Sequence, residues 1–209
     1  MKETFIVVTG DAYPEGNAGA VRTHAFAKIL SESGYSPFII GMGSSTSFQK
    51  REYDGIPYYS LRYARKDLFS RFASRVLFGH NVKKAVKHCD MSKIDGIMYV
   101  SGGGVALRYV KKLSKQYGIP LYFDSVEWYS PGEFCMGVFS PAYIANNRLN
   151  THGIDRNFRV FSISTFLEDH FNKRGISTVR IPVIMDVQSM PARVTREFSD
   201  TSDKIRIAY

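Results

Sequence analysis

The strongest constraint on the fold is a regular alternation of short apolar runs with longer amphipathic segments. Segments with apolar residues at helical spacing cover 18–33, 67–87, 103–117, 140–150 and 164–174. Around them lie apolar runs of strand length, at 4–9, 36–41, 56–60, 95–100, 120–124, 158–163 and 178–181. Strands that alternate with helices in this way build a parallel sheet covered by helices. The sequence therefore predicts an α/β fold, a Rossmann-like, doubly wound and mostly parallel sheet.

The ends and faces of two helices can be placed more closely. Val21, Ala25 and Ile29, with Phe26 and Leu30, repeat at helical spacing, which predicts the apolar side of the first helix. Gly34 fits as the residue that ends this first helix. Ser164 stands where the N-cap of the last helix should be.

The last part of the sequence changes character. Residues 186–203 are polar and irregular, which is typical of a linker. A new strand-like pattern, KIRIAY, then begins at 204–209. We therefore expect one domain over residues 1–185, an interdomain linker over 186–203, and the first strand of a second domain at 204–209.

Composition excludes several classes of protein. Hydrophobic residues make up 44% and charged residues 22% of the 209 residues, which predicts a packed globular core. No segment reaches the ~18 apolar residues of a membrane span, and the first apolar run is too short for a signal peptide. Cys89 and Cys135 are too few for a disulfide framework or a zinc site, so we interpret them as reduced thiols in a cytoplasmic protein. The five histidines lack metal-ligand spacing and there is no G-x-S-x-G motif, so metalloenzyme and hydrolase functions are disfavoured.

The basic charge is concentrated in one segment. Residues 62–88 contain eight Lys or Arg and one acid, and so carry seven of the nine net positive charges. On a helical wheel, Arg71 and Arg75 lie opposite an apolar side that includes Leu77, and Phe78 projects from the polar side. This pattern suits a helix attached to an anionic membrane surface. A helix with a plain solvated face is the alternative, and nucleic acid is disfavoured because stacking aromatics and a binding motif are missing.

The first strand, its loop and the following helix have the arrangement in which α/β proteins hold phosphates. The loop glycines Gly10, Gly16 and Gly19 match neither G-x-G-x-x-G nor a G-x-x-x-x-G-K-[ST] loop. Backbone N–H groups at the helix N-terminus would still favour an anion, and Arg22 could add a charged fork. The alternative is that the glycines serve only to turn the chain. The same two interpretations apply to a second glycine cluster at 102–104.

A third loop, at 122–134, gathers acidic and aromatic residues. Asp124, Glu127 and Glu133 surround Trp128, the only tryptophan. Carboxylates beside an aromatic ring are typical of sugar binding, since hydroxyls need acceptors and C–H faces need a flat apolar surface. A carboxylate there could also act as a general base. The alternative is a surface loop whose tryptophan fills a gap in the core.

Several of these segments together resemble the N-terminal domain of the family-4 retaining glycosyltransferases, which have the GT-B fold of two facing Rossmann-like domains. The matching segments occur in the family's order. They are PEGNAGAVRTHAFAKILSESGY at 14–35, YGIPLYFDSVEWYSPGEF at 117–134, FRVFSISTFLEDHFNKRGISTVRIPVIMDV at 158–187, and DKIRIAY at 203–209.

The resemblance implies transfer of a hexose-type sugar from a nucleotide-sugar to a glycan or lipid-linked acceptor, with retention of configuration. It implies no cofactor beyond the nucleotide-sugar co-substrate, no strict need for a metal, and work on envelope sugars at the cytoplasmic face of the membrane. The N-terminal domain mainly holds the acceptor, so this chain alone is expected to lack the donor site and to be inactive. The implied substrate-binding residues are Gly16, Asn17, Ala18 and Gly19 facing the donor phosphates with Arg22 near, Trp128 and Glu127 on the acceptor side, and Ser164 at the edge of the cleft.

One departure from the family concerns the catalytic base. Many members carry a histidine where this chain has Val126, which makes Glu127 or Asp124 the candidate base. We expect Arg22 and Glu127 to lie near the surface, so that the fold would survive their replacement. The alternative functions are a stand-alone nucleotide- or sugar-binding module and a Rossmann oxidoreductase, the latter disfavoured by the missing glycine fingerprint.

Overall fold

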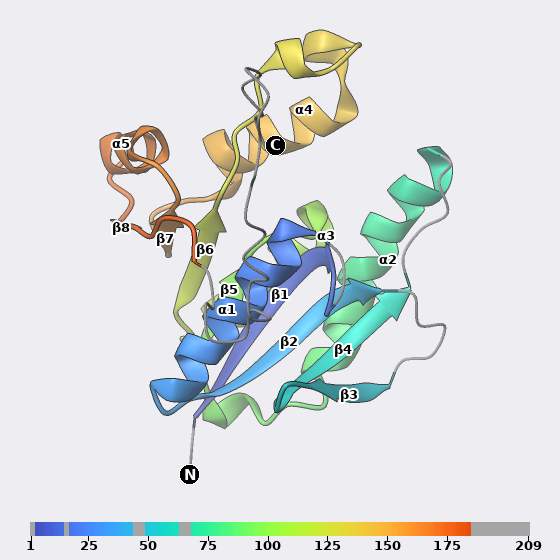
Figure 1. Ribbon diagram of the computed structural model, residues 1–209, viewed down its shortest axis with the longest axis vertical. Coiled ribbons are helices and arrows are strands. Elements are labelled where there is room, and N and C mark those ends of the chain that lie inside the picture. Colours follow the sequence, from blue (N-terminus) through green and yellow to red (C-terminus); the bar gives the residue numbers. More distant parts are fainter. Residues whose placement is uncertain (1–2, 15–16, 44–48, 63–67, 185–209) are drawn as a thin grey trace, which may run out of the picture.

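The computed structural model describes residues 3–14, 17–43, 49–62 and 68–184, with side chains described outside 61–76. Within these ranges, eight strands form one sheet in the order β3-β4-β2-β1-β5-β6-β7-β8 (Figure 1). The strands are β1 (Thr4–Ala12), β2 (Ser36–Gly43), β3 (Lys50–Tyr53), β4 (Ile56–Arg62), β5 (Ile94–Tyr99), β6 (Leu121–Ser125), β7 (Phe158–Ser162) and β8 (Thr178–Arg180). All neighbouring strands are parallel except β3, which runs antiparallel to β4.

The helices fall close to their predicted positions. They are α1 (Ala18–Glu32), α2 (Leu68–Val86), α3 (Gly103–Tyr117), α4 (Pro141–Arg148) and α5 (Thr165–Lys173). Short helical turns occur at η1 (Met91–Lys93), η2 (Pro131–Glu133), η3 (Gly137–Phe139) and η4 (Leu149–Gly153), the last a π-helical turn. The predicted α/β class and the mostly parallel sheet are confirmed.

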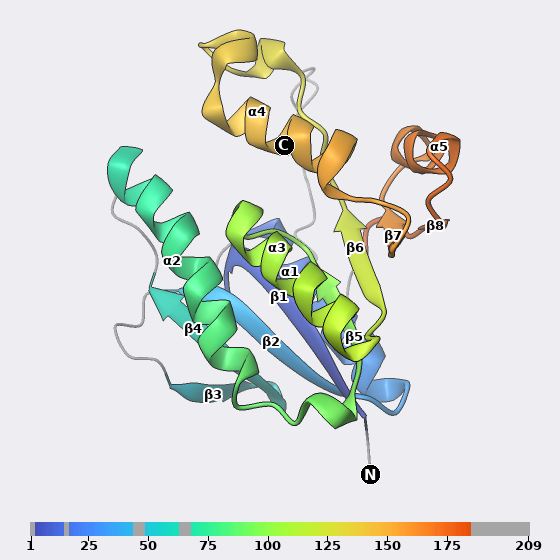
Figure 2. The same cartoon turned by 180° about the vertical axis from the view of Figure 1, so that it is seen from behind.

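The helices cover both faces of the sheet, as a doubly wound fold requires. α1 lies on one face (Figure 1), and α2 and α3 lie side by side on the other (Figure 2). Within β1, Phe5 and Val7 belong to the core on the α1 face, while Ile6 and Val8 belong to the core beneath α2 and α3. This alternation follows from the two-residue period of a strand, and it explains why the central strands are apolar throughout.

Strand β3 was not predicted. Its four residues, Lys50–Tyr53, are all exposed and lack an apolar alternation. The turn to β4 is made by Asp54 and Gly55, both at positive φ (51° and 74°). An Asp-Gly pair is a strong hairpin signal and was the available clue.

The predicted apolar repeat of α1 is buried only in part. Ala25 and Phe26 are buried and Leu30 packs against the core, whereas Val21 and Ile29 are 62% and 45% exposed. The buried stripe consists of Ala20, Arg22, Thr23, Ala25, Phe26 and Ala27. Small and polar side chains make up most of this stripe, so the larger apolar residues alone did not define it. Gly34, at φ 94°, does follow the helix end as predicted.

The predicted exposed aromatic of α2 is also wrong. Phe78 is only 2% exposed, whereas Leu77, expected on the apolar side, is exposed. A Cβ on Gly102 would lie 2.4 Å from the Cε1 atom of Phe78, so the ring fills the space that this glycine leaves open. Glycine is also suited to the positive φ (130°) of position 102. This part of the glycine cluster therefore has a structural reason, the packing of α2 against the start of α3.

Some predictions lie outside the described residues: the linker at 186–203, the strand at 204–209, and the side chains of Arg71 and Arg75. Among the described helices, none has the length and hydropathy needed to cross a bilayer. Within the described ranges, no three His, Cys, Asp or Glu side chains form a group that could hold a metal ion.

The contact of α2 with α3 gives a first prediction. A Cβ added at Gly79 would lie 2.4 Å from Cγ1 of Val105 and 3.0 Å from the backbone N of Ala106. Overpacking of this kind costs about 1–3 kcal/mol, more than the helix-propensity gain of up to about 1 kcal/mol for Gly→Ala. We expect Gly79→Ala to lower the free energy of unfolding, measured by urea denaturation.

Gly104→Ala is the matched control, because the nearest atom to its added Cβ is 4.0 Å away. It should be neutral or stabilising. Equal stability of the two variants would contradict the close packing at Gly79.

Candidate functional site

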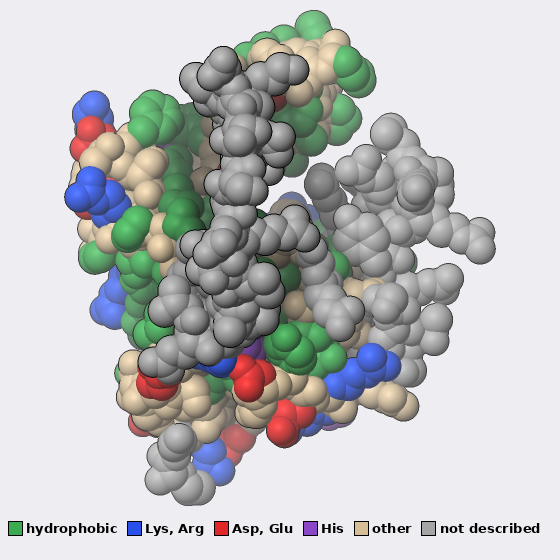
Figure 3. All heavy atoms as spheres, viewed as in Figure 1, with side chains coloured by type: hydrophobic (Ala, Val, Ile, Leu, Met, Phe, Trp, Pro, Cys, Tyr) green, Lys and Arg blue, Asp and Glu red, His purple; other side chains and the backbone are tan. Residues whose placement is uncertain are grey.

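The loops that follow the parallel strands meet at one edge of the sheet, which is where doubly wound folds bind ligands. The segment between β6 and β7, including η2, η3 and α4, projects beyond this edge (Figures 1 and 2). Figure 3 shows apolar side chains at the tip of this projection, and the exposed ones are Met136, Val138, Phe139 and Ile144.

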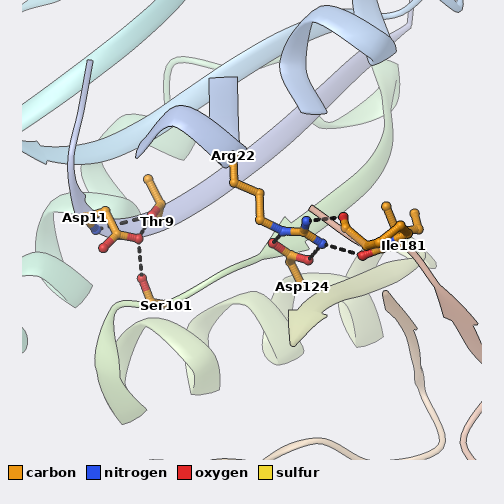
Figure 4. Close-up of polar contacts among 7 residues, drawn as sticks. Thr9, Asp11, Arg22, Ser101, Asp124 and Ile181 are labelled. Carbon is orange, nitrogen blue, oxygen red and sulfur yellow. Dashed lines mark hydrogen bonds and ion pairs between the residues drawn. The ribbon is translucent and has the colours of Figure 1, made fainter. Parts of the chain in front are cut away.

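A buried ion pair ties this edge together. The Nε and Nη2 atoms of Arg22 donate to the two carboxylate oxygens of Asp124 over 2.8 and 2.9 Å (Figure 4). Nη1 donates to the carbonyl of Pro182 over 2.7 Å, and Nη2 also donates to that of Ile181 over 3.1 Å. The guanidinium lies 5.0 Å from the ring centre of Phe26. Arg22 therefore joins α1, β6 and the segment that follows β8.

This arrangement corrects the prediction that Arg22 lies near the surface. Arg22 is 7% exposed and Asp124 is 2% exposed. Four of the five guanidinium N–H groups donate to Asp124 or to backbone carbonyls, which leaves little capacity for a substrate phosphate. Burial raises the pKa of the Asp124 carboxyl, and the hydrogen bonds from Arg22 oppose that rise. Since both Asp124 oxygens accept from Arg22, the geometry favours Glu127 over Asp124 as a base.

The glycine loop is organised around a residue that sequence reasoning missed, Asp11. Its carboxylate accepts from Thr9 Oγ1 over 2.9 Å and from Asn17 Nδ2 over 3.1 Å. The Ser101 hydroxyl lies 3.4 Å from Asp11 Oδ2 (Figure 4). It also accepts from the backbone N–H of Gly10 over 2.8 Å. Asp11 therefore links the ends of β1 and β5 to the loop before α1. The clue was an acid two residues after the first apolar run, 4–9.

Asp11 also places a negative charge beside the first turn of α1. A Cβ on Gly19 would lie 2.7 Å from Asp11 Oδ2, so a larger residue there would displace the Asp11 carboxylate. Asn17 is the N-cap of α1, accepting from the backbone N–H of Ala20 over 3.1 Å. Ala18 is exposed, and Gly16 lies outside the described residues. The dipole of α1 favours an anion at this helix end. Because the Asp11 carboxylate already lies there, its negative charge would repel a donor phosphate.

The acidic-aromatic loop after β6 is fixed by three asparagines. Asn146 Nδ2 and Asn150 Nδ2 donate to the carbonyl of Glu127 over 3.2 and 3.3 Å. Asn146 Oδ1 accepts from the backbone N–H of Tyr129, and Asn147 Oδ1 accepts from Trp128 Nε1, both over 3.0 Å. These asparagines lie on α4 and η4 and were not predicted. Their crowding in the run ANNRLN was the only signal.

The carboxylate of Glu127 is exposed and oriented. The hydroxyl of Tyr129 donates to its Oε2 atom. The hydrogen bond to Glu127, followed by partial burial, raises the pKa of Tyr129 to about 12. Glu127 is thus held at the carboxyl edge of the sheet, where a carboxylate can accept from a hydroxyl of a bound molecule.

Trp128 and Ser164 both lie at the carboxyl edge of the sheet, Trp128 in the loop after β6 and Ser164 between β7 and α5. The Trp128 ring is half-buried, 4.2 Å from the ring centre of His170 and 5.9 Å from that of Phe166 on α5. Ser164 is the N-cap of α5, and its hydroxyl accepts from the backbone N–H of Leu167 over 3.4 Å. Trp128 therefore anchors the loop against α5, and its flank with Phe166 is apolar and open.

Comparison with known proteins finds similarity in structure alone. No family model matches the sequence, and no curated protein matches it. Sucrose-phosphate synthase from Thermosynechococcus elongatus has a similar structure, with a TM-score of 0.60 and 10% identity over 87% of this chain and 48% of that one. The catalytic domain of starch synthase IV from Arabidopsis thaliana, bound to ADP and acarbose, matches with a TM-score of 0.53 and 12% identity over 90% of this chain and 53% of that one. This chain has the fold of one half of a GT-B glycosyltransferase.

The GT-B half is not confined to transferases. UDP-N-acetylglucosamine 2-epimerase from Rickettsia bellii matches with a TM-score of 0.54 and 11% identity over 88% of this chain and 45% of that one. The chain spans about half the length of the epimerase and of the sucrose-phosphate synthase. At these identities the likeness concerns the fold of the GT-B half.

The Arg22–Asp124 pair gives a second prediction. Removing one partner of a buried ion pair leaves an uncompensated charge and costs about 3–5 kcal/mol, whereas replacing both is often close to neutral. We expect Arg22→Met to lower the free energy of unfolding by about that amount in urea denaturation. The double variant Arg22→Met, Asp124→Leu should recover much of the loss. Additive losses in this double-mutant cycle would contradict the pairing.

The Tyr129–Glu127 contact gives a third prediction. Glu127→Gln removes the negative charge that disfavours the phenolate, so the pKa of Tyr129 should fall from about 12 toward the ordinary value of 10.0. Ultraviolet difference titration of the variant against the parent, with Tyr129→Phe to identify the signal, measures this change. An unchanged titration would show that the two side chains do not interact in solution.

Proposed function

We propose that this chain is the acceptor-side half of a retaining glycosyltransferase, which transfers a sugar from a nucleotide-sugar to a glycan or lipid-linked acceptor. The observation that carries the proposal is Glu127. It presents an exposed carboxylate at the ligand-binding edge of a GT-B half, on a backbone held by two asparagine amides. Retention of configuration and a hexose-type donor rest on the sequence resemblance.

The site supplies two things that an acceptor sugar needs. Glu127 accepts a hydrogen bond from the attacking hydroxyl and takes its proton as that oxygen bonds to the anomeric carbon of the donor sugar. The bond from this carbon to the diphosphate breaks in the same step, and the nucleoside diphosphate leaves from the face that the hydroxyl enters, which retains the configuration. The open apolar flank of Trp128 and Phe166 offers a surface for the C–H face of a sugar ring. Tyr129 orients Glu127, while Arg22 and Asp124 position the strand end from which the loop departs.

The donor is assigned chiefly to a second Rossmann-like domain. The chain spans about half of the sucrose-phosphate synthase and starch synthase structures, which supports a division of the work between two halves. The negative charge of Asp11 beside α1 also disfavours a diphosphate held by this loop alone. The first domain is thus assigned to residues 1–185, and this chain by itself is expected to show no turnover.

A sugar-transfer assay tests the proposal. The product of the complete open reading frame and this chain alone are each incubated with a panel of nucleotide-sugars and a membrane extract, and the anomeric configuration of the product is determined by NMR. Transfer with retention by the longer polypeptide supports the proposal. Tight binding of a nucleotide-sugar without transfer by either would favour a stand-alone binding module, and epimerisation of UDP-N-acetylglucosamine would favour the reaction named for the Rickettsia protein.

The role of Glu127 gives a fourth prediction. In the complete enzyme, Glu127→Gln keeps the shape of the side chain but removes its capacity to accept a proton. A general base contributes about 10²- to 10⁴-fold, so we expect kcat to fall by that factor while KM changes little. Asp169→Asn, an exposed acid on α5, is the control and should retain full turnover. Wild-type kcat in Glu127→Gln would refute the assignment.

A further inference from the structure

Two helices on the same face of the sheet carry positive charge without any acid. α2 and α3 pack side by side (Figure 2), and neither contains Asp or Glu. Their exposed bases, with one lysine just beyond α2, form what we call the basic face: Lys83, Lys84, Lys87, Arg108, Lys112 and Lys115. The sequence pattern located positive charge in residues 62–88 only, and the fold brings the charges of α3 beside it.

The charges of the basic face are not neutralised within the described protein. Among the described residues, none of these six side chains forms an ion pair with an acid. Lys111 on α3 does form an ion pair, since its Nζ atom lies 2.5 Å from Asp155 Oδ2, but Lys111 is not part of the basic face. An uncompensated face of one sign repels itself and attracts polyanions.

The composition of the face decides which polyanion fits. Five of the six bases are lysines, compact point charges without the planar fork with which arginine reads fixed phosphates. Phe78 is buried, and the exposed large apolar side chains in the described part of the two helices are Leu77 and Tyr117. Base stacking, on which single-stranded nucleic acids depend, therefore has little to use. A fluid layer of anionic headgroups needs neither fixed geometry nor stacking.

We propose that the basic face binds the surface of an anionic phospholipid membrane, with α2 and α3 lying along it and no aromatic side chain inserted. This differs from the expectation of an amphipathic helix anchored by Phe78. Each lysine near an anionic bilayer strengthens binding about fivefold, and the attraction is screened by salt. The proposal does not rest on the proposed reaction, because vesicle binding requires no sugar transfer.

Vesicle cosedimentation of this chain tests the proposal. The probes are vesicles of phosphatidylcholine alone and vesicles that also contain phosphatidylglycerol, at low and high ionic strength. We expect binding to the anionic vesicles only, weakened by salt. The α3 double variant Lys112→Gln, Lys115→Gln should reduce the partition coefficient by about 25-fold, with the unfolding midpoint unchanged.

Arg51→Gln, Arg159→Gln is the matched control, since it removes two exposed charges whose cross-strand partners, Tyr58 and Tyr122, belong to the core on the α1 side of the sheet. It should bind within about twofold of the parent, as expected for charges remote from the lipid. Equal loss of vesicle binding in the two double variants would show that net charge alone governs binding. That result would overturn the assignment of membrane binding to the basic face. Three other results would overturn the proposal that the basic face binds an anionic membrane. They are equal binding to phosphatidylcholine vesicles, no binding to anionic vesicles, and tighter binding to duplex DNA at the same salt concentration.

Discussion

The arrangement of the ligand-binding edge depends on one buried ion pair. Arg22 comes from α1, Asp124 from the end of β6, and the carbonyls of Ile181 and Pro182 from the segment after β8. The acceptors lie 102 to 160 residues from Arg22 in the sequence, yet one guanidinium group donates to all of them. Two charges removed from water are tolerated only when each is fully paired and hydrogen-bonded. The pair therefore fixes the position of β6, from whose end the Glu127 loop departs.

Around that pair, the site is built from side chains that orient other side chains. Asn146 and Asn150 hold the backbone of Glu127, and Tyr129 holds its carboxylate. On the other side, Asn17 holds Asp11 against α1. A reacting group must be held within a fraction of an ångström to be effective, and amide side chains from a short helix provide that restraint without adding charge. The chemistry of the edge is thus concentrated in two exposed or half-buried carboxylates, Asp11 and Glu127.

The sequence was sufficient for the order of the strands and helices, because central parallel strands are apolar on both faces and their helices are amphipathic. It failed where the deciding contact was between distant residues. Arg22 seemed to be a surface residue because its partner, Asp124, lies on β6. Phe78 seemed exposed because Gly102, which leaves space for its ring, lies distant in the sequence, just before α3. The exposed hairpin strand β3 lacked any apolar pattern. Of the candidate site residues, Glu127 and Trp128 lie at the carboxyl edge of the sheet, whereas the contacts of Asp11 and of the three asparagines arise only in the tertiary structure.

The two borders of the sheet have a consequence for assembly. The outermost strand on one side, β3, exposes Lys50, Arg51, Glu52 and Tyr53, and the outermost strand on the other, β8, has three residues. Charged or very short border strands are poor templates for a strand from another molecule. Pairing with a strand of another molecule is thereby disfavoured at both borders of the described sheet, so a partner would contact this protein through its loops and helices.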